Sequence, residues 1–130
     1  MMLSGYFSPS RWPACVAPLI LVHDVDDCTH VINVFHEVDI ATAAEFEAEL
    51  AKPTEHGPVV IDFSQCRYID TSAINPLLRA YERFGDRLQI VVAAKSQVER
   101  LFRLLHLQSV LPIVSSLEEA FLRLAPAAIA

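Results

Sequence analysis

The stretch Val59-Val60-Ile61-Asp62-Phe63-Ser64-Gln65-Cys66-Arg67-Tyr68-Ile69-Asp70-Thr71-Ser72-Ala73 decides how this chain folds. Residues 59–63 form a short, almost continuous apolar run, which is typical of a strand buried on both faces of a sheet. A polar loop and the apolar pair Tyr68-Ile69 follow, and Asp70-Thr71-Ser72 then precedes a helix-like stretch over residues 77–84. The pattern places two hydroxyl groups beside a carboxylate at a strand-to-helix turn. Such a hydroxyl either caps a helix or carries a chemical switch.

Outward from this stretch, apolar runs alternate with segments of helical spacing. Strand-like runs cover residues 19–25, 31–35, 87–93 and 111–114. Capping signals at Thr42, Ser96 and Ser115-Ser116 each precede apolar residues at helical intervals. The resulting order, β-β-α-β-α-β-α-β-α, predicts an α/β domain. We expect a mixed sheet of four or five strands, with about four helices packed mainly on one side.

The expected core of this domain is drawn from several of these segments. We predict that its buried side chains include Val60, Phe63, Val91, Leu101 and Phe121. The helix after the Asp-Thr-Ser turn contains a proline near its start. Because Asn-Pro suits the N-cap and first position of a helix, we expect regular helix to begin near Pro76 and residues 71–75 to be less regular.

Length and charge limit the classes of function. The chain has 130 residues and is 53% hydrophobic, which predicts one folded domain. Its net charge is −6, and the charge is uneven: residues 1–66 hold two basic and ten acidic side chains, whereas residues 67–130 hold eight basic and six acidic ones. This distribution argues against direct nucleic-acid binding, which needs a concentrated basic face. It favours a polar protein partner.

Cysteine and histidine spacing gives no sign of a cofactor. Cys15, Cys28 and Cys66 lack C-x-x-C spacing, so we expect reduced cysteines in a cytoplasmic protein and no metal. No nucleophile with a base and an orienting group is visible, so we expect no enzymatic activity. We also expect no membrane insertion, because a spanning helix needs about 18 apolar residues in a row.

The domain boundaries follow from proline content and from the periodic segments. Residues 1–18, with three prolines, are predicted to be an N-terminal leader outside the core. Residues 19–125 form the predicted domain, and residues 126–130 a short C-terminal tail.

Two segments and the element order together resemble the STAS domain family, in the form found in bacterial anti-sigma factor antagonists. The first is His36-Glu37-Val38-Asp39-Ile40-Ala41-Thr42-Ala43, against a family pattern of roughly G-E-x-D-x-x-T-A. The second is Tyr68-Ile69-Asp70-Thr71-Ser72-Ala73, where the family has D-S-S-G-L-G. The resemblance covers about residues 19–124. Ala73, Asn75 and Pro76 depart from the second pattern.

The resemblance implies a protein switch that regulates transcription. An anti-sigma factor with Ser/Thr kinase activity would bind the unmodified protein and release its sigma factor. Phosphorylation of Ser72, or alternatively Thr71, would end that binding, and a phosphatase would restore it. The partner-binding residues implied are Asp39, Asp70, Thr71, Ser72, Asn75 and Arg79.

Two other functions fit the same resemblance. The chain could serve as a STAS accessory subunit of an ABC-type lipid transporter, where docking needs no phosphorylation. It could also be a ligand-binding STAS module; the absence of a glycine-rich phosphate loop counts against a nucleotide as that ligand.

Overall fold

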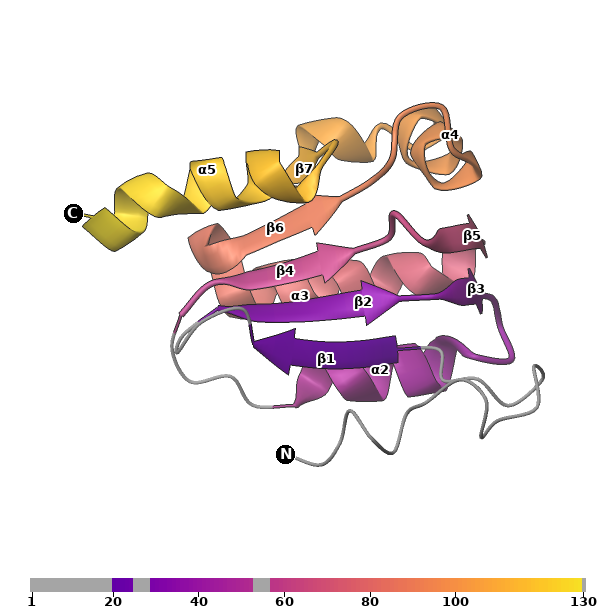
Figure 1. Cartoon of the computed structure of the whole chain (residues 1–130). Coiled ribbons are helices and arrows are strands. Elements are labelled where there is room, and N and C mark those ends of the chain that lie inside the picture. Colours follow the sequence, from indigo (N-terminus) through magenta and orange to yellow (C-terminus); the bar gives the residue numbers. More distant parts are fainter. Residues whose placement is uncertain (1–19, 25–28, 53–56, 130) are drawn as a thin grey trace, which may run out of the picture.

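The apolar run that opens the deciding stretch forms the central strand of a five-stranded sheet (Figure 1). A computed structural model describes residues 20–24, 29–52 and 57–129. In it β4 (Val59–Asp62) is buried along its whole length, and the strand order is β1-β2-β4-β6-β7. Burial on both faces explains why this strand is apolar at successive positions.

The other strands make the sheet mixed, as predicted. β2 (His30–Val34), β4, β6 (Leu88–Val91) and β7 (Ile113–Val114) run parallel to one another. At one edge β1 (Ile20–Asp24) pairs antiparallel with β2. The parallel connections pass through helices, as this topology requires.

Helices cover the two faces of the sheet unequally. The helices α2 (Ala43–Ala51), α3 (Ile74–Phe84) and α4 (Gln97–Leu104) contribute to one core cluster, with side chains such as Ile61 and Ile90. On the opposite face α5 (Leu117–Ile129) packs over alternate strand residues, Val31, Val60, Val91 and Val114. The prediction that helices lie mainly on one side is confirmed.

The predicted core residues are placed as follows. Val60, Phe63 and Val91 are buried, as expected. Leu101 and Phe121 are only half-buried, because each lies at the margin of a core cluster rather than inside it. Phe63 has aromatic neighbours on two helices: its ring centroid lies 5.9 Å from that of Phe46 and 6.2 Å from that of Phe102. These contacts tie α2 and α4 to the end of β4.

The structure describes more of the C-terminal end of the chain than of the N-terminal end. The predicted leader over residues 1–18, with Cys15, lies outside the described residues, as does Cys28. α5 continues to Ile129, so residues 126–129 of the predicted tail are helical.

A second, two-stranded sheet was not expected from the sequence. β3 (His36–Val38) pairs parallel with β5 (Cys66–Ile69), with Val38 opposite Ile69. β3 is three residues long, and His36 and Glu37 are exposed, so it lacks an apolar run. This small sheet brings together the two segments that carry the family resemblance.

The start of the helix after β5 corrects one prediction. Residues Thr71–Ala73 form a short 3₁₀ turn, η3, and α3 begins at Ile74, two residues before the proline. Regular helix therefore does not start at Pro76, and Asn75 is not its N-cap. The first four N–H groups of a helix have no partner within it, so Pro76 in the first turn removes no hydrogen bond. The expected irregularity is limited to the 3₁₀ turn.

The free edge of β5 is completed by a side chain instead of a strand. The Ile69 N–H donates to Gln97 Oε1 at 3.0 Å, and Gln97 Nε2 donates to the Ile69 carbonyl at 3.2 Å. Ser96 caps α4, since its Oγ accepts a hydrogen bond from the Glu99 N–H at 3.0 Å, as the capping signal predicted. The start of α4 is thus fixed to the residue that precedes Asp70.

We predict that Gln97→Leu destabilises the fold and loosens this edge. Ile69 is fully buried, and the substitution would leave its N–H and carbonyl without their partner. Each unpaired buried group costs about 1–3 kcal/mol. For the two groups, chemical denaturation should show a loss of about 2–6 kcal/mol, and hydrogen exchange should show faster exchange of the Ile69 amide. Gln108→Leu, at an exposed glutamine, is the control. Equal stability of both variants would show that Gln97 does not hold the strand.

Candidate functional site

The Asp70-Thr71-Ser72 turn is organised by one carboxylate. Asp70 is the N-cap of η3, and its Oδ1 accepts a hydrogen bond from the Ser72 N–H at 2.8 Å. The same oxygen accepts the Ser72 hydroxyl proton. Ser72 is half-buried and has its hydroxyl engaged, whereas Thr71 is exposed. The capping interpretation of this carboxylate is therefore confirmed.

The first motif forms a tight loop between β3 and α2. Asp39 Oδ1 accepts from the Ala41 N–H at 3.0 Å and from the Thr42 N–H at 3.2 Å. Thr42 Oγ1 accepts from the Asp39 N–H at 3.0 Å and lies 3.2 Å from the Glu37 carbonyl, to which it can donate. Asp39 thus has the structural role of a turn residue, which leaves its role in contacting a partner untested.

The capping-box prediction at Thr42 is wrong in its chemistry. α2 does begin at Ala43, with Thr42 as N-cap, but the threonine side chain makes no capping hydrogen bond. The hydroxyl instead bonds back into the loop, because Asp39 supplies closer partners. Local side-chain to backbone bonds of this kind compete with helix capping.

The β3–β5 pair places the two loops at the same end of one small sheet. Val38 lies opposite Ile69, and the Asp70 N–H donates to the Val38 carbonyl at 3.0 Å. Asp39 and Asp70 are therefore the first residues after two paired strands and lie at the same end of the small sheet. Ile40, between the two ends of the first loop, is 85% exposed. Ile40 was not singled out from the sequence. The feature that could have drawn attention to it is its position as a large apolar residue within the loop motif.

Asn75 and Arg79 extend the site along α3. Both are exposed, and Arg79 already has a partner: its Nε donates to Glu47 Oε2 of α2 at 2.6 Å. A hollow of about 220 Å³ lies along these helices and is lined in part by Leu50, Pro76 and Arg83. Exposed ion pairs contribute about 0–1 kcal/mol, so an acidic group on a partner could replace Glu47.

The described residues bear on three other kinds of functional feature, namely a reactive thiol, a metal site and a membrane-spanning helix. Burial raises the pKa of the Cys66 thiol, which donates to the Tyr68 carbonyl at 3.4 Å, and a raised pKa makes a thiol less reactive. Across residues 20–24, 29–52 and 57–129, no group of three or more His, Cys, Asp or Glu side chains is placed to hold a metal ion. No helix in this same part of the chain is long and apolar enough to span a membrane.

Comparison with solved structures identifies the fold. An anti-sigma factor antagonist from Mycobacterium paratuberculosis superposes with a TM-score of 0.74 at 24% identity, covering 82% of this chain and 92% of the other. SpoIIAA of Bacillus in the phosphorylated form gives a TM-score of 0.57 at 16% identity, with 85% and 99% covered. A sulfate transporter family protein from Wolinella succinogenes gives 0.60 at 13% identity, with 82% and 90% covered.

The sequence comparisons agree with this fold. No curated protein matches the chain. The family model described as the STAS domain matches residues 20–120, which include the main sheet, both motif loops and the start of α5. With most of its length covered by that match, this chain belongs to the STAS domain family.

Proposed function

We propose that this protein is an anti-sigma factor antagonist controlled by phosphorylation of Ser72. In the unmodified state it binds an anti-sigma factor with Ser/Thr kinase activity, and the sigma factor is released. The observation that carries the proposal is the Ser72 hydroxyl, held by the Asp70 carboxylate in a surface turn beside the Asp39 loop. Structural similarity to an anti-sigma factor antagonist and to phosphorylated SpoIIAA supports it.

Electrostatics explains how the modification would act. A phosphate adds about −1.5 to −2 charges at neutral pH and removes the proton that Ser72 donates to Asp70. Two unit charges 4 Å apart repel by about 1–4 kcal/mol between bulk water and a protein surface. The N-terminus of a helix stabilises an anion by only about 0.3–1 kcal/mol. Repulsion therefore prevails, and the turn that presents Ser72 must rearrange.

The rest of the proposed contact surface surrounds this turn. Ile40 supplies an apolar contact, Asp39 and Asn75 supply polar groups, and Arg79 can exchange Glu47 for a partner carboxylate. Thr71 is the alternative phosphorylation site, because it lies in the same 3₁₀ turn and is exposed. In this proposal the protein acts in the cytoplasm, and a phosphatase restores binding.

We predict that Ser72→Asp weakens binding to the anti-sigma factor at least tenfold, which equals about 1.4 kcal/mol. Ser72→Ala should bind like the wild type and resist phosphorylation, because it lacks the hydroxyl without adding charge. Calorimetric titration with the cognate kinase gives the affinities. Mass spectrometry after incubation with kinase and ATP identifies the modified residue and separates Ser72 from Thr71.

The matched control for this prediction is Ser109→Asp, which adds the same charge at an exposed serine of η5 (Leu107–Ser109). It should leave the affinity unchanged. If Ser72→Asp binds as tightly as the wild type, the phosphorylation switch is wrong. Docking on a transporter ATPase would then be the better explanation of the same surface.

We further predict that Asp70→Asn reduces the effect of Ser72→Asp. Asparagine keeps a side-chain oxygen for the N-cap but removes the charge that repels position 72. In a double-mutant cycle, the loss of affinity caused by Ser72→Asp should be smaller in the Asp70→Asn background. The same loss in both backgrounds would show that repulsion by Asp70 is not what disrupts the turn.

A further inference from the structure

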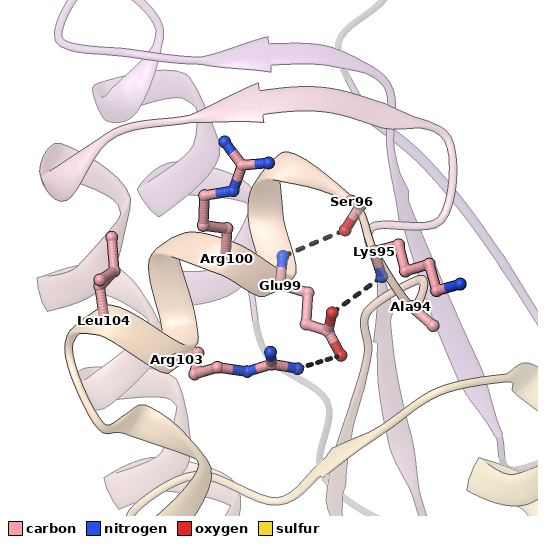
Figure 2. A pocket seen from close by; sticks show the side chains of 7 residues that line it. All are labelled: Ala94, Lys95, Ser96, Glu99, Arg100, Arg103 and Leu104. Carbon is pink, nitrogen blue, oxygen red and sulfur yellow. Dashed lines mark hydrogen bonds and ion pairs between the residues drawn. The ribbon is translucent and has the colours of Figure 1, made fainter.

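The outer side of α4 forms a shallow hollow that the proposed function does not use. Figure 2 shows the side chains around it, which come from α4, along its length, and from the loop before it. The hollow measures about 500 Å³, and its lining includes Lys95, Glu99, Arg100, Arg103 and Leu104. We call this the α4 surface. The inner side of α4 is packed in the core, so these residues face away from it.

The charges of the α4 surface are not balanced. Glu99 is the carboxylate among these residues, and it is already engaged: Oε1 accepts from the Lys95 backbone N–H at 2.8 Å, and Oε2 lies 3.3 Å from Arg103 (Figure 2). Within the described part of the chain, neither the Lys95 ammonium nor the Arg100 guanidinium has an ion-pair or hydrogen-bond partner.

All other described lysine and arginine side chains do have partners. Ion pairs with glutamates engage four of them besides Arg103, namely Lys52, Arg67, Arg79 and Arg123. Arg83 and Arg87 donate to backbone carbonyls and lie over the Phe84 ring. In a chain of net charge −6, the two unpartnered cations thus gather on one surface.

One exposed apolar side chain, Leu104, lines the hollow together with these cations, and two more follow it in the chain. Leu104, at the end of α4, is 69% exposed, and Leu105 and Val110, which follow in the chain, are 41% and 50% exposed. Single exposed apolar residues are common, but arginine is enriched at protein interfaces, and the centre of an interface is more apolar than the rest of the surface. The Ser96 cap and the Gln97 bonds to Ile69 fix the start of α4, so binding there requires little ordering.

We propose that the α4 surface docks an acidic segment of a protein partner. Carboxylates would bind Arg100 and Lys95, with Arg100 able to form a bidentate pair, and an apolar side chain would rest on Leu104. This inference goes beyond the Ser72 switch and does not rest on it. A membrane surface fits less well, since recognition of anionic lipid uses clusters of four to eight basic residues. Nucleic acid also fits less well, because this protein has a net charge of −6 and would repel the phosphate backbone.

The test titrates a short peptide of alternating glutamate and leucine into the full chain. The chain carries the isotope label, and its amide chemical shifts are followed. The shifts should concentrate over residues 95–104, and the affinity should fall as salt is raised. Arg100→Gln should weaken binding about tenfold. Arg123→Gln is the matched control, because it removes the same charge from another helix whose arginine has a glutamate partner. It should leave the affinity unchanged.

Several results would overturn the proposal. The first is an absence of shifts over residues 95–104, or equal weakening by Arg100→Gln and Arg123→Gln. The second is preferential binding to vesicles of phosphatidylserine, which would assign the surface to a membrane. The third is self-association that Arg100→Gln abolishes, measured by sedimentation, which would assign it to a second copy of this chain.

Discussion

The parallel pairing of β3 with β5 is the constraint on which the candidate site depends. Val38 and Ile69 lie opposite each other and are fully buried, and the Val38 carbonyl accepts the Asp70 N–H. Burial of these two side chains supplies the free energy, since fully burying each is worth about 1.5–3 kcal/mol. The pairing brings the loops that begin at Asp39 and Asp70 to the same end of the sheet. Without it, two motifs far apart in the chain would not share a surface.

The main sheet and its helices could be predicted from the sequence because their signals are local. β4 is a continuous apolar run, and the Ser96 cap has its acidic partner three residues later. β3 could not be predicted, because its stability comes from a partner strand and from one buried valine. The start of α3 was misplaced for a related reason: proline restricts a helix interior, but Pro76 lies in the first turn, where the restriction costs no hydrogen bond. Thr42 shows that a capping pattern gives the helix boundary even where the hydroxyl bonds elsewhere.

The uneven charge along the chain has a different meaning in three dimensions. The sequence alone suggests an acidic half and a basic half, which a protein partner would contact as two separate surfaces. In the structure, two acidic side chains of the first half face basic ones of the second: Glu47 of α2 pairs with Arg79 of α3, and Glu37 of β3 lies 3.7 Å from Arg67 of β5. These two pairs neutralise part of the asymmetry within the fold. What remains for recognition is local, namely the carboxylate loops beside Ser72 and the cations of the α4 surface.

The helix cap seen at the Asp-Thr-Ser turn and the switch proposed for it involve the same hydrogen bonds. Asp70 stabilises the turn because it accepts from both the backbone N–H and the hydroxyl of Ser72. A stable cap presents one defined surface to a partner, which lowers the entropy lost on binding. Phosphorylation would remove the hydroxyl proton and place an anion against the capping carboxylate, so the interaction that defines the turn would become repulsive. A residue that only capped the helix would not need its partner to be a hydroxyl: the backbone N–H of Ser72 alone satisfies the N-cap. In the proposed switch, the additional side-chain bond would make this turn sensitive to phosphorylation.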